Sequence, residues 1–238
     1  MWLWIIATIS AFYIKGLCGF ANTLVFTSVL GFGENNVIIS PVELILGYPT
    51  NLILTWENRK ELKKQVFIPL SILVLAGSIP GACLLKNVDS GIIKIVFGVV
   101  IILLGTEMYF RETRDVRIKK SNVLLGIIGV LSGVLCGLFG VGALLAAYIG
   151  RVTKSSSEFK ANISAVFIVE NTFRIILYSI LGIISSASLK QAIVLMPFML
   201  LGLFMGVMSG KEMDDKLVKR IVIILLIISG IVLVIKNL

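Results

Sequence analysis

An arginine inside an apolar segment is the residue of this sequence best suited to bind an anion. Arg174 lies within the hydrophobic stretch 163–185, and a cation at membrane depth is so costly that a functional role is its first interpretation. Glu170 precedes it by one helical turn, a spacing at which the two side chains can form a salt bridge. Two interpretations stay open: a structural ion pair, or an Arg174 that contacts the anion. Glu170 is also the only deep carboxylate that we expect to carry a coupling proton.

Two glycine-rich stretches, 15–23 and 131–150, interrupt long apolar runs and can supply neutral donors. If each stretch is the tip of a broken helix, its second arm begins with unpaired backbone N–H groups. Such a helix N-terminus favours an anion by about 0.3 to 2 kcal/mol. Two tips and one cation would suffice for a singly charged group. The candidate binding residues at the tips are Lys15, Gly19, Asn22, Thr23, Gly137, Gly140 and Gly142.

Several of these residues have an alternative interpretation. Lys15 either contacts the anion or extends to the membrane interface, and the glycines either expose N–H groups or only allow close helix packing. Cys18 and Cys136 occupy equivalent tip positions, and their thiols either handle reactive sulfur species or are simply small packing residues. Asn51 and Asn171, in matching helices of the two halves, complete the candidate site, because their amides can orient oxygen atoms or donate to them.

The composition of the chain indicates that these residues lie in a membrane protein. Of the 238 residues, 58% are hydrophobic and only 15% are charged, and the mean hydropathy is +1.03, more apolar than a soluble domain can bury. The net charge of +9 then belongs to the loops that orient membrane helices, and we expect no nucleic-acid partner. Histidine, the commonest metal ligand, is absent from the sequence, so we expect neither a metal nor a cofactor.

The apolar segments divide the chain into two halves with the same order of elements. The segment 2–32 would measure roughly 46 Å as one helix, against about 30 Å for the hydrocarbon core, so we predict a broken or re-entrant hairpin there. The predicted fold is an all-α polytopic membrane protein of two inverted repeats, each with one hairpin and three spanning helices. The first repeat covers 1–110, with hairpin 2–33 and helices 37–56, 67–85 and 92–109; a basic linker covers 111–122; the second repeat covers 123–238, with hairpin 123–150 and helices 163–185, 193–207 and 218–235.

A direct comparison of the two halves supports the repeat. With one constant shift and no gap, five residues of the first half match identical residues of the second: Gly77, Gly81, Asp89, Lys94 and Gly105 align with Gly202, Gly206, Asp214, Lys219 and Gly230. Basic residues then indicate the orientation. They divide almost evenly between the two sides if every apolar segment crosses, but gather on one side if 123–150 returns to the side it entered. The positive-inside rule favours the second arrangement and predicts four cytoplasmic loops: 57–65, 111–122, 151–160 and 209–220.

The chain resembles the TauE/SafE family of sulfite exporters and sulfonate permeases over nearly its whole length. Each half opens with a Gly-rich broken segment, and a later helix of each half carries a Gly-x-x-x-Gly pair, Gly77 with Gly81 and Gly202 with Gly206. The basic run Asn58-Arg59-Lys60 follows the next span of the first half. The resemblance implies a multi-pass protein of the bacterial plasma membrane that transports small sulfur-containing or organic anions.

Together, the residues and the resemblance predict a secondary transporter of small anions, sulfite or an organosulfonate. It would work by alternating access around a midplane site between the two opposed tips. An anion channel, or a carrier for short organic carboxylates, is the alternative. The sequence lacks the Gly-x-Ser-x-Gly and His-Glu-x-x-His motifs, so we expect no enzyme activity. The expected partners are a small anionic substrate, membrane lipid, a proton or sodium ion as coupling ion, and a second copy of the chain in a homodimer.

Overall fold

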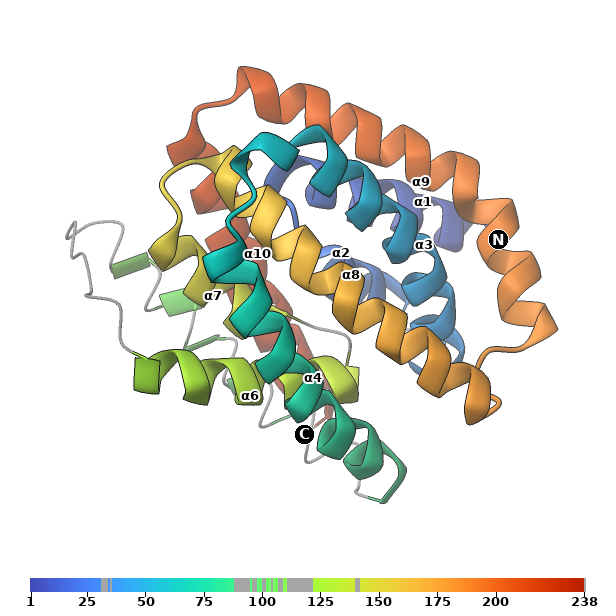
Figure 1. Ribbon diagram of the computed structural model, residues 1–238. Coiled ribbons are helices and arrows are strands. Elements are labelled where there is room, and N and C mark those ends of the chain that lie inside the picture. Colours follow the sequence, from blue (N-terminus) through green and yellow to red (C-terminus); the bar gives the residue numbers. More distant parts are fainter. Residues whose placement is uncertain are drawn as a thin grey trace.

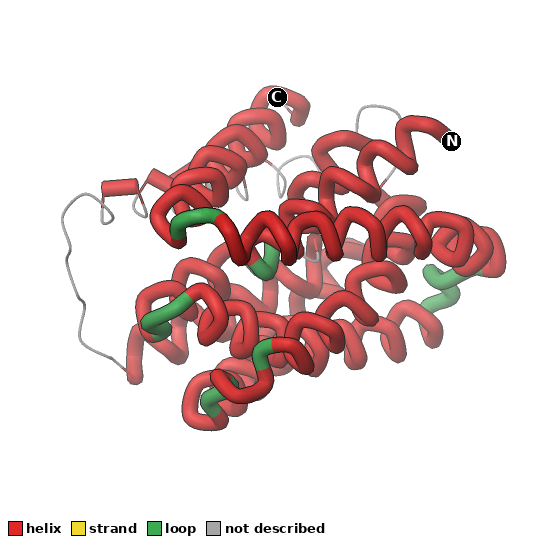
Figure 2. The backbone as a smooth tube through the Cα atoms, turned by 90° about the horizontal axis from the view of Figure 1, so that it is seen from above, coloured by secondary structure: helices red, strands yellow, loops and turns green. Residues whose placement is uncertain are grey.

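The computed structural model shows a chain that is helical through the residues it describes. These are residues 1–30, 34, 36–87, 122–139 and 142–237, with scattered positions between 95 and 110. Figure 2 shows helices joined by short loops, with no strand in this described part, which confirms the all-α prediction there. Most of the predicted helix 92–109, and the predicted linker 111–122 except Asn122, lie outside the described residues.

The first half begins with a helix broken by three residues. Its two arms are α1 (Trp2–Cys18) and α2 (Asn22–Leu30). α1 ends because Gly19 adopts a left-handed conformation, with φ at 88°, and its N–H returns to the Lys15 carbonyl, a common glycine C-cap. Ala21 also has a positive φ, 72°, which costs a residue with a Cβ about 1–2 kcal/mol. The break therefore lies within the predicted stretch 15–23.

The described part of the first half continues with two long helices and a short one. These are α3 (Asn36–Glu57), the 3₁₀ helix η1 (Arg59–Glu61) and α4 (Lys64–Asn87). α3 and α4 correspond to the predicted helices 37–56 and 67–85.

The second half also opens with two helices separated by a short break, followed by long helices. It contains α6 (Asn122–Phe139), α7 (Ala143–Val152), α8 (Ser156–Ile180), α9 (Ser186–Glu212) and α10 (Asp215–Asn237). α8 begins well before the predicted residue 163, because the Ser155 side chain accepts a hydrogen bond from Glu158 N and caps the helix. α9 likewise begins before residue 193, because Ser185 and Ser188 form a reciprocal capping box. Residues 156–160 of the predicted loop 151–160 are therefore helical.

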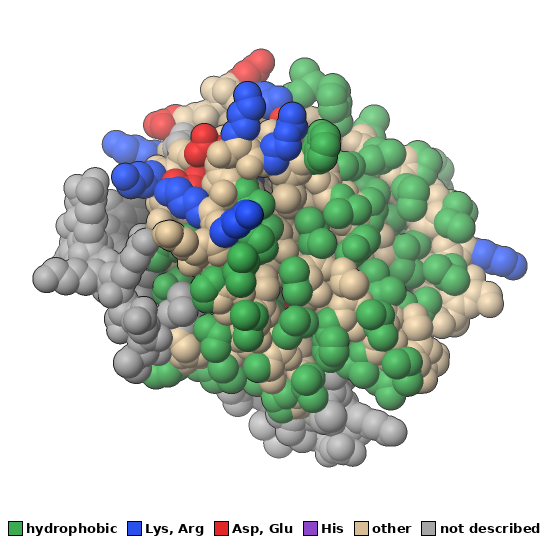
Figure 3. All heavy atoms as spheres, viewed as in Figure 1, with side chains coloured by type: hydrophobic (Ala, Val, Ile, Leu, Met, Phe, Trp, Pro, Cys, Tyr) green, Lys and Arg blue, Asp and Glu red, His purple; other side chains and the backbone are tan. Residues whose placement is uncertain are grey.

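Four of the described helices are long and apolar enough to cross a membrane. They are Ile38–Glu57 in α3, Lys64–Gly81 in α4, Ser156–Ile180 in α8 and Ser186–Glu212 in α9. Apolar side chains dominate much of the surface seen in Figure 3, and large ones such as Ile180 and Phe204 are well exposed. An apolar surface of this extent suits lipid rather than water, as expected of a polytopic membrane protein.

Glycines let two pairs of helices approach closely, and each pair joins the two halves. α1 packs along α9, and α6 packs along α4. A Cβ on Gly206 of α9 would lie 2.8 Å from the Tyr13 carbonyl carbon and 3.0 Å from Leu17 N, both in α1. A Cβ on Gly77 of α4 would lie 2.8 Å from Val134 N of α6. Small residues thus permit backbone contact at both seams, as in other membrane helix pairs.

α3 and α8 cross in the middle of the molecule and run in opposite directions. The hydroxyls of Ser40 in α3 and Tyr178 in α8 are 3.3 Å apart. Beyond the other end of α3, the Asn162 amide near the start of α8 donates to the Glu61 carbonyl at 3.4 Å. In Figure 1, both helices lie between the α1–α9 pair and the lower part of the molecule, where α6 is labelled. Because α3 and α8 cross, polar residues from the two halves lie next to each other.

Three of the four predicted basic loops lie together, at what we call the basic end: residues 57–63, 154–160 and 209–214. Residues from all three loops line one pocket, and the Lys63 ammonium lies 2.7 Å from the Glu158 carboxylate. Figure 3 shows most of the visible Lys and Arg side chains gathered at one corner of the molecule. Lys190 belongs to the first turn of α9, whereas Lys211 belongs to its last turn at the basic end.

Candidate functional site

The first hairpin tip holds a buried carboxylate from α3. Glu43 Oε1 accepts hydrogen bonds from the Asn22 amide and, at 2.8 Å, from the Thr23 hydroxyl. Both donors are the first residues of α2, directly after the left-handed turn at Ala21. Glu43 is only 3% exposed. The first tip therefore binds an anionic group, and that group is a side chain of the protein itself.

Arg174 of α8 connects this carboxylate to the second tip. Its guanidinium lies 3.5 Å from Glu43 and 3.7 Å from Glu170. Its Nη1 also donates to the Cys136 carbonyl of α6 at 3.2 Å, and the Tyr178 ring lies beside it, 5.6 Å from Cζ to the ring centroid. Nε of Arg174 is buried without a hydrogen-bond partner in the described part of the chain. The pairing of Glu170 with Arg174 is present, but Arg174 has a second carboxylate partner.

Lys15 is the second buried cation of the site. It is 1% exposed, and its Nζ donates to the Gly47 carbonyl of α3 at 3.4 Å, so it does not extend to the membrane interface. We call Lys15, Glu43, Glu170 and Arg174 the central cluster. Its two cations and two carboxylates have formal charges that cancel. Four charges are tolerated at this depth because each lies close to groups of opposite charge or to hydrogen-bond partners.

The face of α3 around Gly47 is polar. A Cβ on Gly47 would lie 3.3 Å from Glu43 Oε1, 3.5 Å from Asn22 Nδ2 and 3.9 Å from Asn171 Nδ2, so three polar side chains converge there. Asn51 follows one turn later. Its Nδ2 and Oδ1 are both buried without a hydrogen-bond partner among the described residues, and a buried unpaired amide costs about 1–3 kcal/mol. Among the predicted site residues, Asn51 therefore has the side chain that would gain most from hydrogen bonds to a ligand.

Two glycines predicted as binding residues contact side chains of α8. A Cβ on Gly19 would lie 2.8 Å from Cγ of Lys160, so the tip of the first hairpin rests on that side chain. A Cβ on Gly142 would meet the ring of Phe167. These contacts give both glycines a packing role at the position where the hairpins reach α8.

The Cys136 thiol lies near Glu43, Glu170 and Arg174 of the central cluster, and the Cys18 thiol lies near Lys15. Gly137 is buried in the last turn of α6, whereas Gly140 lies outside the described residues. Cys18 and Cys136 are buried thiols, and Cys18 Sγ donates to the Ile14 carbonyl at 2.8 Å. Cys136 contributes its backbone carbonyl to Arg174.

Glu43 was not predicted as a site residue, although it is buried like Glu170. A sequence signal for it exists. Glu43, Gly47, Asn51 and Thr55 recur at every fourth position of an otherwise apolar helix, and residues at this spacing share one face. This polar stripe of α3 faces α8 at Arg174 and Asn171.

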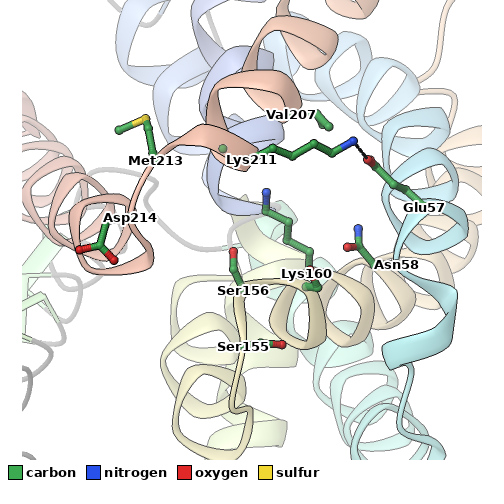
Figure 4. Close-up of a pocket in the computed structure, with 11 residues that line it drawn as sticks. Glu57, Asn58, Ser155, Ser156, Lys160, Val207, Lys211, Met213 and Asp214 are labelled. Carbon is green, nitrogen blue, oxygen red and sulfur yellow. Dashed lines mark ion pairs between the residues drawn. The ribbon is translucent and has the colours of Figure 1, made fainter.

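A pocket of about 430 Å³ opens at the basic end near the first tip. Figure 4 shows Lys160 between Ser156 and Asn58, with its ammonium directed away from α8; that ammonium donates to the Gly16 carbonyl of α1 at 2.9 Å. Lys211 and Glu57 form a 2.8 Å ion pair beside the pocket. The pocket therefore joins the basic end to the backbone just before the tip of the first hairpin.

The chemistry available at the central cluster is reversible binding of an oxyanion and of a proton. Guanidinium, ammonium and amide groups donate to oxygen atoms, and the two carboxylates can accept protons. Among the described residues, no group of three His, Cys, Asp or Glu side chains is placed to hold a metal ion.

Comparison with known proteins identifies one family. A sequence model of the family described as Sulfite exporter TauE/SafE matches residues 4–233. No curated protein and no solved structure matches the chain.

Proposed function

We propose that this chain, which belongs to the sulfite exporter TauE/SafE family, is a secondary transporter that carries small anions across the bacterial plasma membrane. The observation that carries the proposal is the environment of Arg174. Its guanidinium is buried between the two hairpin tips and keeps Nε without a hydrogen-bond partner among the described residues. A buried cation with a spare donor suits a permeating anion. Family membership makes sulfite or an organosulfonate the first candidate substrate, and short carboxylates the second.

The donors near Arg174 suit the oxygen atoms of such a substrate. Asn51 offers an amide that is unpaired within the described structure, and Lys15 offers an ammonium whose 3.4 Å bond to Gly47 is long. Asn22 and Thr23 offer two more donors at the first tip. We propose that the substrate binds between the tips at residues Lys15, Asn22, Thr23, Asn51, Asn171 and Arg174, with Gly19, Gly137, Gly140 and Gly142 shaping the tips.

The packing of the helices supports two inverted repeats. α1 and α9 run in the same direction, since Gly202, Gly206 and Gly210 of α9 approach Ile9, Tyr13 and Leu17 of α1 in that order. If the two halves are exchanged, α1 corresponds to α6 and α9 corresponds to α4, and α6 and α4 also run in the same direction. In contrast, α3 and its counterpart α8 run in opposite directions. Inverted repeats with broken helices near the midplane are typical of alternating-access transporters.

The basic end supports an orientation. By the positive-inside rule the basic end faces the cytoplasm, and the two hairpins then enter from opposite sides. With the interior negative, moving one negative charge outward gains about 2.3 kcal/mol per 100 mV. Export of an anion can therefore run uncoupled, whereas import needs a proton or sodium ion. Glu170 is the carboxylate that the sequence nominates for a proton.

An anion channel is the second candidate function, because the same donors would serve a pore. The four side chains of the central cluster are each at most 3% exposed, which favours an enclosed site over an open pathway. Single-channel currents in planar bilayers would reverse this preference.

The proposal is tested by a thermal-shift screen of the purified protein with sulfite, methanesulfonate, thiosulfate and short carboxylates. We expect at least one sulfur oxyanion to raise the melting temperature and the Arg174→Gln variant to lose that shift. Arg59→Gln is the matched control, because Arg59 is exposed and stacks on Trp56 at 4.7 Å. If no anion shifts the wild type, or if Arg174→Gln shifts as the wild type does, the proposed site is wrong.

A further inference from the structure

Glu43 occupies the donors that the first tip and Arg174 would offer to a substrate. Its Oε1 accepts from Asn22 and Thr23 at the start of α2, and its Oε2 lies 3.5 Å from the Arg174 guanidinium. A carboxylate held by one cation and two neutral donors has the same charge, and nearly the same oxygen arrangement, as a bound monovalent oxyanion. Glu43 thus occupies the position that the proposed function gives to the substrate anion.

We propose that Glu43 is an internal substitute for the substrate anion, displaced when substrate binds, and that each displacement takes up one proton. The inference rests on the proposed transport function. One oxyanion replaces the Glu43 carboxylate at Arg174, Asn22 and Thr23, and one proton passes from hydronium in the bulk water to a Glu43 oxygen. This proton transfer is the one covalent change.

Proton uptake follows from the charges that surround Glu43. The groups near it are Lys15 on α1, Asn22 and Thr23 on α2, Cys136 on α6, and Arg174 with Glu170 and Tyr178 on α8. The titratable residues of α9, Lys190, Lys211 and Glu212, lie near the two ends of that helix. The cluster is formally neutral, so an added anion leaves an uncompensated negative charge. A buried carboxylate that has lost its donors cannot stay ionised at acceptable cost, and protonation restores neutrality.

Glu43 suits this role better than Glu170. Displacing Glu43 frees donors on two elements at once, the start of α2 and Arg174 of α8. Glu170 lies on the same helix as Arg174, at 3.7 Å, and its Oε1 makes no hydrogen bond in the described structure. Removing Glu170 would therefore free only some of the donors of the Arg174 guanidinium and no donor at the first tip.

One consequence concerns the membrane potential. A monovalent anion that moves with one proton carries no net charge, so the potential neither drives nor opposes its transport. Direction is then determined by the concentration gradients of the anion and the proton.

The test uses the purified full chain with methanesulfonate, whose single charge does not change between pH 6 and 8, and with sulfite as a second probe. For the wild type we expect methanesulfonate affinity to rise as pH falls, by up to about tenfold per pH unit. Glu43→Gln should bind it at least tenfold more tightly at pH 8 and lose the pH dependence. Glu158→Gln is the matched control: Glu158 is another buried carboxylate, paired with Lys63 at the basic end, and its variant should keep the wild-type pH dependence.

A measurement on the wild type keeps the proposal testable if Glu43→Gln does not fold. Methanesulfonate added to weakly buffered protein should cause uptake of about one proton for each anion bound. Anion binding without proton uptake, or a folded Glu43→Gln with wild-type affinity and pH dependence, would overturn the role of Glu43. It would leave the transport proposal intact, because that proposal fails only if the wild type binds none of the anions screened or if Arg174→Gln binds them as the wild type does.

Discussion

Glu43 and Arg174 lie on corresponding helices of the two halves and approach each other to 3.5 Å. They are level because α3 and α8 run in opposite directions through the middle of the molecule. Glu43 continues the contact to the first hairpin tip through Asn22 and Thr23, and Arg174 continues it to the second tip through the Cys136 carbonyl. A direct polar connection therefore runs from one tip to the other through this ion pair.

Removing one member of the Glu43–Arg174 pair should lower the stability of the protein more than removing both. We expect Arg174→Gln to destabilise the protein by about 3–5 kcal/mol, because it leaves two buried carboxylates without their cation. Adding Glu43→Gln should restore part of that loss, since an amide needs no counter-charge. Thermal unfolding of the wild type, both single variants and the double variant in the same detergent checks this. A double variant no more stable than Arg174→Gln would show that the two side chains are not energetically coupled.

The seam between α1 and α9 should not tolerate a side chain at Gly206. A Cβ there would lie within 3.0 Å of three backbone atoms of α1, so Gly206→Val must separate the helices. We expect a large fall in folded, monodisperse protein by size-exclusion chromatography. Gly126 of α6 is the control, because a Cβ there would meet nothing within 4 Å. Gly126→Ala should be neutral or raise the melting temperature, since alanine is favoured over glycine in helices by about 1 kcal/mol.

Labelling of single cysteines should place both Lys60 and Ser157 on the cytoplasmic side. In a variant without native cysteines, Lys60→Cys and Ser157→Cys should react with an impermeant maleimide only in inside-out vesicles. Lys190→Cys, in the first turn of α9, should react only in right-side-out vesicles. All three residues are exposed, so access rather than burial decides the result. Labelling of Lys60→Cys and Ser157→Cys from opposite sides would refute the inverted second half.

The sequence predicted the helical class, the family and the position of the first break, because these depend on local patterns. Gly19 ends α1 with a left-handed φ, the conformation that glycine favours at a helix C-terminus. The start of α8 was also encoded locally. Ser155 and Glu158 have the spacing of a capping box, but the apolar pattern by which we predicted the helix begins only at residue 163.

The partner of Arg174 could not be predicted in the same way. Glu170 shares a helix with Arg174, so its proximity follows from spacing alone. Glu43 meets Arg174 only because α3 and α8 cross at one particular register, and register depends on side-chain packing along both helices. The α3 stripe of Glu43, Gly47, Asn51 and Thr55 shows that one face is polar, but not which residue of α8 it meets.

Asn51 and Asn162 should respond oppositely to loss of their amides. Asn162 accepts from Lys63 N at 3.1 Å and donates to the Glu158 carbonyl at 2.7 Å, so Asn162→Ala should lower stability by about 1–3 kcal/mol and leave transport per folded molecule unchanged. In the part of the chain that the structure describes, the Asn51 amide has no hydrogen-bond partner, so it already carries a desolvation cost. Asn51→Leu should therefore keep or raise the melting temperature.

For the same reason Asn51→Leu should lower anion transport in proteoliposomes by about tenfold or more, the equivalent of one lost hydrogen bond to a charged group. A side chain retained for folding cannot show gain of stability and loss of transport together, because its removal would lower both. Loss of stability in Asn51→Leu with unchanged transport would assign Asn51 to the fold. Unchanged or higher stability of Asn51→Leu together with reduced transport would mean that the buried Asn51 amide is kept for the substrate at the expense of stability.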